Sequence, residues 1–186
     1  MARQVELVVE NGTIVTGANS FVSESQIIAY ALMRGVNLPH TNDTELDAIA
    51  VLGIKAMDYL KIQPWRGEPV SDTQTTPFPR KNMNVSPSFP ENAVPASVID
   101  AQLQLTLLAN NGVDLIPMSS GVGFLVKEKI GPIENVYSEK VGISESGLPI
   151  LPGIEALLFP WLLGNFDGVI PVAIYSVGGG RGRQGC

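Results

Sequence analysis

The chain has 186 residues, a formal net charge of -6 and a single cysteine, Cys186. A chain of this length buries one sizeable core, so we expect a single domain over residues 1–186. The acidic balance gives no chain-wide attraction to nucleic-acid phosphates or anionic lipids. A single cysteine excludes an internal disulfide and a cysteine metal cluster, which agrees with a reducing compartment.

An extended segment and a short helix are predicted first. Residues 5–9, VELVV, are short and β-branched and predict an edge strand or an extended arm. Ser23 then precedes the sequence ESQIIAYALMR, and Gln26 follows three residues later, which is the pattern of a capping box. Gly35 marks the end of this helix.

A second helix is predicted to start with Asp43 or Thr44 as its N-cap and to run to about Lys61. Glu45 and Asp47 fall in its first turn, where the helix dipole favours carboxylates, so these acids need no catalytic role. One face of the helix is apolar and indicates burial in the core; it is formed by Leu46, Ile49, Gly53, Met57 and Leu60.

A proline-rich loop is predicted over residues 63–95, because its composition breaks both helices and sheets. Loops of this length are commonly functional or wrap another surface. Pro95 suits the first turn of a third helix, which Asn111 and Gly112 end. The helix has two apolar stripes, and we expect the second to pack against a neighbouring molecule; it consists of Ile99, Leu103 and Leu107.

The fold class is therefore mainly α: a small helical bundle core at about 20–112, with a β-hairpin or ribbon and extended N- and C-terminal arms. Alternating apolar and charged residues predict the ribbon at about 122–142. An apolar C-terminal arm is predicted over 148–186, with a short helix at 153–164. Prolines and acids interrupt this arm, so we predict no membrane span.

The sequence contains little material for catalysis. His40 is the only histidine and lies in a turn, so a histidine triad or a multi-histidine metal site is not expected. The acids near residue 45 lack the spacing of a calcium loop, and the glycine-rich segments lack the ending of a P-loop. We predict no enzyme, no metal and no cofactor. Arg181 and Arg183 could touch phosphate, but a solvated or partner-docked tail is favoured.

Aromatic residues suggest contact surfaces. A tryptophan just after a helix usually buries its ring at the edge of a core, so a structural or interface role is favoured for Trp65 and Arg66 over ligand stacking. The complete set of candidate interface residues is Trp65, Arg66, Ile99, Leu103, Leu107, Phe159, Trp161 and Tyr175.

Seven segments resemble, in order, a family of tailed-phage proteins. They are VENGTIVTGANSFVS, AIAVLGIKAMDYL, WRGEPVS, PFPR, VPASVIDAQLQLTLLA, VKEKIGPIENVYSE and IEALLFPWL. The family comprises head-to-tail adaptor or head-completion proteins, which also carry the description DnaT-like single-stranded DNA-binding protein.

The resemblance implies a structural connector in the neck of the virion, assembled in the host cytoplasm. It implies a ring of twelve subunits beneath the portal protein, a tail or neck protein below, and genomic DNA passing without specific binding. The WRGEPVS turn and its loop would then lead out to a neighbouring subunit or the portal, and the arms would become ordered on assembly. The alternative is a single-stranded DNA-binding protein of phage replication, which should have a basic groove with aromatics. The acidic composition favours the connector.

Overall fold

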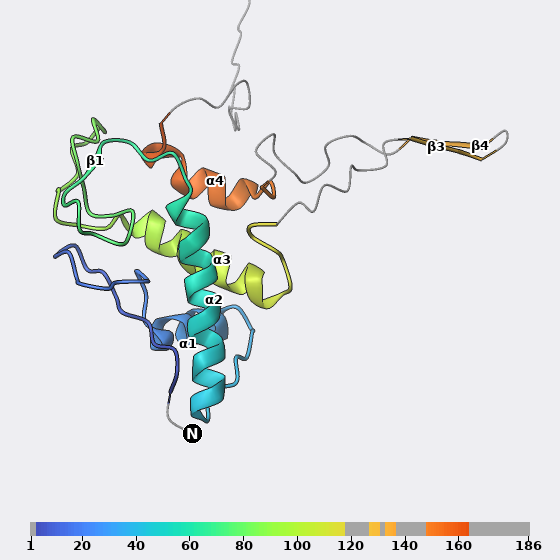
Figure 1. Cartoon of the computed structure of the whole chain (residues 1–186), viewed down its shortest axis with the longest axis horizontal. Helices are drawn as coiled ribbons and strands as arrows, with labels where there is room; N and C mark the ends of the chain where they lie inside the picture. Colours follow the sequence, from blue (N-terminus) through green and yellow to red (C-terminus); the bar gives the residue numbers. More distant parts are fainter. Residues whose placement is uncertain (1–2, 118–126, 131–132, 137–147, 164–186) are drawn as a thin grey trace, which may run out of the picture.

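The computed structural model describes residues 3–117, 127–130, 133–136 and 148–163, and it confirms a small, mainly helical fold (Figure 1). The helices are α1 (Glu24–Met33), α2 (Asp43–Lys61), α3 (Ala96–Asn110) and α4 (Pro152–Leu158), and a 3-10 turn, η1 (Phe159–Trp161), follows α4. The strands form two antiparallel pairs, β1 (Glu68–Pro69) with β2 (Arg80–Lys81), and β3 (Lys127–Ile130) with β4 (Ile133–Val136).

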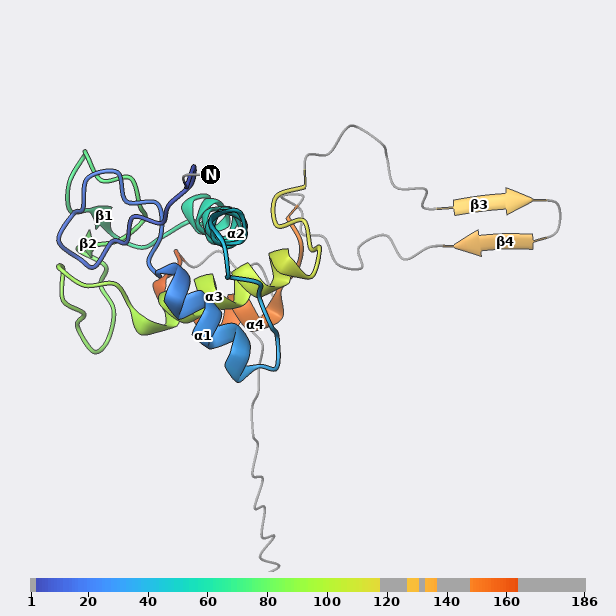
Figure 2. The same ribbon diagram turned by 90° about the horizontal axis from the view of Figure 1, so that it is seen from below.

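Helix α3 is the centre of the helical body, because α1, α2 and α4 all pack against it. Figure 2 shows α2 nearly end-on, whereas α1, α3 and α4 lie across the view, so α2 crosses the other helices at a steep angle. Gln102 of α3 is fully buried at this crossing. Its amide accepts a hydrogen bond from the Phe21 N–H at 2.8 Å and donates to Ser20 Oγ at 2.9 Å and to the Gly53 carbonyl at 3.1 Å.

The helix ends follow local sequence signals with two corrections. Pro95 is the N-cap of α3 and does not lie in its first turn, because its backbone is extended and the helix begins at Ala96. The capping box at Ser23 and Gln26 is confirmed. The N-cap of α2 is Asn42 and not Asp43 or Thr44, because the backbone of Asn42 is extended and its Oδ1 accepts from the Glu45 N–H at 3.0 Å. Asp43 and Thr44 consequently lie inside the helix.

The second stripe of α3 is occupied within the chain, contrary to our expectation of a neighbouring molecule. Leu103 is 8% exposed and belongs to the apolar cluster around α1, and Ile99 and Leu107 pack against that cluster. Since α1, α2 and α4 all pack against α3, its apolar stripes are covered within the chain, and the second stripe packs with residues of α1.

The proline-rich loop, which we expected to lead out to a partner, folds back on its own chain. Phe78 is fully buried in the cluster formed with α2, α3 and α4. Its ring meets those of Phe21, Trp65 and Trp161 edge-to-face, at centroid distances of 6.3, 5.1 and 6.5 Å. Burying a phenyl ring stabilises the loop against the helical body.

The N-terminal segment is an extended arm that its own chain holds. It forms an isolated bridge between Val9 and Ser20 and no longer strand. Arg3 pairs with Glu24 at 2.8 Å and with Asp47 at 3.4 Å. The described part of this arm therefore has polar contacts within its own chain, and the prediction that the arms become ordered on assembly stays untested.

The structure contains the predicted hairpin, and in place of the helix predicted at 153–164 it has the shorter α4 followed by η1. Strands β3 and β4 lie inside the predicted ribbon, and α4 starts at Pro152 and passes into η1 at Pro160. Tyr175 and most of the predicted C-terminal arm lie outside the described residues. No described helix combines the length and apolarity needed to cross a membrane.

Candidate functional site

Residues Trp65 to Gly67 form a turn that Arg80 holds from the far side of the loop. Arg80 Nε donates to the Arg66 carbonyl at 2.7 Å, and Nη2 donates to the Gly67 carbonyl at 2.7 Å. Its Nη1 donates to the Pro77 carbonyl at 3.1 Å. Gly67 has a φ of +67°, and a Cβ there would lie 2.2 Å from the Lys81 carbonyl oxygen, so the turn requires glycine. The segments WRGEPVS and PFPR therefore form one structural unit.

The segment after α4 closes on the same turn. The Arg66 N–H donates to the Trp161 carbonyl at 2.9 Å, and Arg66 Nε donates to the Leu162 carbonyl at 2.7 Å. The Leu163 N–H donates to the Pro64 carbonyl at 2.7 Å. Arg66 thus links two parts of the chain that lie almost one hundred residues apart.

The structure separates the predicted interface residues into two groups. Trp65 is 6% exposed and its Nε1 donates to the Leu60 carbonyl at 2.8 Å, so its ring is part of the core and not a stacking surface. Trp161 is half-buried and donates to Ser97 Oγ at 2.7 Å. Phe159 is 44% exposed and leaves an aromatic ring at the surface close to the closed turn. Among the predicted interface residues that the structure describes, Phe159 is the most exposed, while Arg66, Ile99, Leu107 and Trp161 are half-buried.

A polar groove of about 520 Å³ lies where α2 ends and the loop carrying β1 begins. Cations, hydroxyls and amides line most of it, which suits hydrogen bonding to a polar ligand. The lining residues are Lys61, Gln63, Trp65, Pro69, Ser71, Asp72, Gln74, Thr75, Thr76, Pro77 and Arg80.

The loop wall of this groove is ordered by its own hydrogen bonds. Gln74 Oε1 accepts from the Ser71 N–H at 3.2 Å, and Gln74 Nε2 donates to the carbonyls of Thr76 and Pro79 at 2.8 and 3.1 Å. The Thr75 hydroxyl donates to the Ala18 carbonyl of the N-terminal arm. A wall fixed in this way loses little conformational freedom when a ligand binds.

The groove holds an unusual buried cation. Arg80 is 9% exposed, and burial lowers the pKa of its guanidinium, although an arginine stays protonated in proteins. Across residues 3–117 and 148–163, only Arg3 and Lys61 form ion pairs, so no carboxylate neutralises Arg80 directly. Lys61 pairs with Asp58 at 3.3 Å, and both side chains are well exposed. Exposed pairs of this kind are weak.

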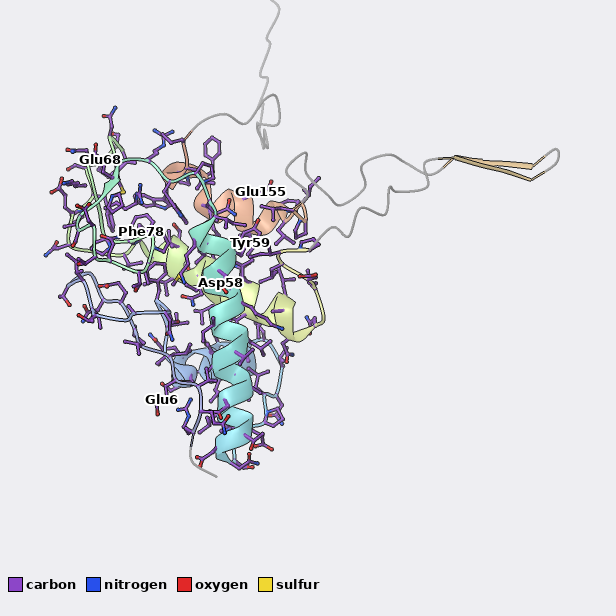
Figure 3. All side chains as sticks on the ribbon, in the orientation of Figure 1. Glu6, Asp58, Tyr59, Glu68, Phe78 and Glu155 are labelled. Atoms are coloured by element: carbon purple, nitrogen blue, oxygen red, sulfur yellow. The ribbon has the colours of Figure 1, made fainter. Side chains whose placement is uncertain are left out.

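Acidic side chains lie mainly elsewhere. Figure 3 shows Glu6 on the N-terminal segment, Glu68 on β1 and Glu155 on α4, and none of them lines the groove. Asp72 is the one carboxylate among the lining residues. In the described ranges, no group of three or more metal-binding side chains comes together.

Sequence reasoning did not identify this groove. Lys61, Ser71, Gln74 and Arg80 are ordinary polar residues of a helix end and a loop when read along the chain. The available signal was Arg80 itself, a cation placed directly after the apolar run PFP. Such a position predicts a buried or half-buried charge that needs polar partners.

The fold and these surfaces define a small, mainly helical protein with a polar, cation-bearing groove. The chain matches, over residues 5–174, the family described as "Putative DnaT-like ssDNA binding protein", and it belongs to that family. No curated protein and no solved structure matches the chain.

The match confirms the DnaT-like part of the resemblance and corrects the function that we derived from it. The description of the family names single-stranded DNA binding, so our prediction of a head-to-tail connector as the main function is wrong. The alternative in our sequence analysis agrees with the family. The ring, the portal and tail partners and the virion location followed from the connector interpretation and stay untested predictions.

Proposed function

We propose that the protein binds single-stranded DNA. The observation that carries this proposal is the family match, which extends over nearly the whole chain, from residue 5 to residue 174. The proposal includes no catalytic step, no cofactor and no membrane contact.

The acidic composition bears on the strength of this binding. A chain with a net charge of -6 repels a polyanion at long range, so the affinity must come from a local contact and must be sensitive to salt. Lys61 and Arg80 supply two cations at the groove. The exposed ring of Phe159 offers a surface on which an unpaired base can stack.

Stacking also gives a reason to prefer single strands over duplex DNA. The bases of a duplex are already stacked and their faces are covered, whereas an unpaired base has a free π-face. Phe159 follows α4 directly, and Arg66 Nε donates to the carbonyl of Leu162, three residues further along the chain. Aromatic rings and guanidinium groups are both common contacts in single-strand binding.

Fluorescence anisotropy of a labelled thymidine 20-mer tests the proposal over a series of salt concentrations. With two to four phosphate contacts, the plot of log K against log salt should have a slope of about -1.5 to -3. A duplex of equal length and label is the matched control and should bind more weakly. Absence of binding at about 50 mM salt and 100 µM protein, where even non-specific contacts are normally detected, would contradict the proposal.

A further inference from the structure

We propose that the groove between the end of α2 and the loop at 69–80 binds a phosphate group of the DNA backbone, with Arg80 and Lys61 as its cations. This inference rests on the proposed function for its ligand, and it assigns the contact to one place on the molecule. The group that the groove binds is then the phosphodiester and not a base.

Arg80 carries a positive charge that pairs with no carboxylate of the described residues. A guanidinium has five N–H donors, and three backbone carbonyls use one each on Nε, Nη1 and Nη2. Two N–H groups are left without a partner among the described residues. A buried cation normally has an anionic partner, and Arg80 lines a groove into which an anion can enter.

Lys61 and polar loop residues also line the groove. Lys61 lies at the last position of α2, and its ammonium group has two further protons beyond the one directed to Asp58. Cations at this end also oppose the partial negative charge of the helix C-terminus, so Lys61 is favoured there in any case. The hydroxyl of Ser71, 2.9 Å from Thr73 Oγ1, adds a group of the type that commonly contacts phosphate oxygens, whereas the Thr75 hydroxyl already donates to the Ala18 carbonyl.

The groove also contains a negative charge. Asp72 also lines the groove, and a carboxylate there weakens anion binding. Asp72 is exposed and sits at the tip of the loop, so its charge is largely screened by water. Lys61 is paired with Asp58 and Asp72 is screened by water, so the local positive charge of the groove comes mainly from Arg80, which pairs with no carboxylate of the described residues.

The exposed residues Lys61 and Asp72 allow a test that leaves the fold intact. In the full chain, Lys61→Gln should weaken binding of the thymidine 20-mer about fivefold and reduce the magnitude of the salt slope by about 0.7, the value of one lost contact. Asp72→Asn should tighten binding about twofold to fivefold. Lys55→Gln and Asp100→Asn are the matched controls, because both residues are exposed helix residues outside the groove. Both should stay within about 1.5-fold of the wild type.

A second measurement separates the site from the function. Thymidine 5′-phosphate, titrated at low salt, should shift the NMR amide signals of residues 71–76 in the wild type and not in Lys61→Gln. DNA binding that Lys61→Gln and Asp72→Asn leave unchanged would overturn the site and keep the function. Shifts at 71–76 without any DNA binding would support the anion site and overturn the function. Absence of both would overturn both proposals.

Discussion

The helices and the irregular segments of this protein are held together in different ways. The helices begin and end at local signals, such as the Ser23 capping box and the Asn42 cap, and pack through apolar faces. The N-terminal arm and the loop at 62–95 are fixed in addition by single polar side chains that bind backbone groups far away in sequence, above all Gln102 and Arg80, and Phe78 anchors the loop in the core. The helices therefore follow local signals, while the irregular segments depend on long-range contacts and form most of the groove wall.

The largest expected effect comes from the residue that joins both regions. Phe78→Ala removes a fully buried ring that belongs to the loop and contacts three other aromatic rings. We expect a loss of about 3–5 kcal/mol in the free energy of unfolding, measured by urea denaturation followed by circular dichroism. Phe159→Ala is the control, since that ring is 44% exposed, and it should cost far less. Equal losses would show that the loop contributes little to the core.

Gln102→Leu should have the next largest effect. The change keeps the approximate volume of the side chain but leaves the Phe21 N–H and the Gly53 carbonyl without their partner in a buried place. We expect a loss of about 2–3 kcal/mol by the same denaturation measurement. Gln104→Leu is a suitable comparison, because Gln104 lies two residues further along α3 and is half-buried. A neutral result for Gln102→Leu would mean that the arm is held by other contacts.

A helix cap should matter less. Asn42→Ala removes the oxygen that accepts from the Glu45 N–H at the start of α2, which should cost about 1 kcal/mol in thermal or urea unfolding. Asn42→Ser should restore most of the loss, because serine also caps helices well. If Asp43→Ala were the more damaging change, the assignment of the cap to Asn42 would be wrong.

The smallest expected effect is a pH dependence confined to the N-terminal arm. Partial burial pushes the pKa of Glu24 upward, but hydrogen bonds from Arg3 and the Leu7 N–H outweigh it and hold the pKa below its ordinary 4.5. The Gln4 N–H, joined by the Val5 N–H and Arg3, holds the pKa of Asp47 below its ordinary 3.8. A carboxyl group with a lowered pKa stabilises the folded arm above its unfolded pKa, and this contribution is lost as the pH falls through the folded pKa.

Hydrogen exchange of the arm measures this effect. The amides of Gln4, Val5 and Leu7 should be protected at pH 6 and lose protection below about pH 4, after correction for intrinsic exchange rates. The amides of α3 serve as internal controls. Glu24→Gln should reduce the protection of Leu7 already at pH 6, because a neutral amide accepts hydrogen bonds more weakly than a carboxylate. Uniform loss along the chain would indicate global acid unfolding.

The difference between local helix signals and long-range contacts also explains which parts of the fold could be predicted from the sequence. The helices were predicted well because capping boxes, helix-ending glycines and apolar stripes are local patterns. The position of the loop was missed because Arg80 reaches back fourteen residues to Arg66, a distance that no local pattern specifies. The second stripe of α3 was assigned to a partner because a linear pattern does not reveal that α1 covers it.

The function was misassigned for a similar reason. Net charge is a property of the whole chain, and we used it against DNA binding. A groove depends on where a few charges meet in space, and Lys61 and Arg80 meet only after the loop has folded back onto α2. An acidic total is compatible with a positive local site.

The link between Leu163 and Pro64 has a consequence for how freely the connection between α3 and α4 can vary in length. The two helices pack on each other directly, and the segment after α4 is anchored at the end of α2, although some forty residues separate α3 from α4 in the sequence. Both ends of that connection are thus fixed independently of what lies between them. Since the free-energy cost of closing a loop grows slowly with its length, by about 0.6 kcal/mol for each doubling, the helical body should tolerate insertions and shortenings there. This connection is the natural place for a fluorescent label or a fused domain.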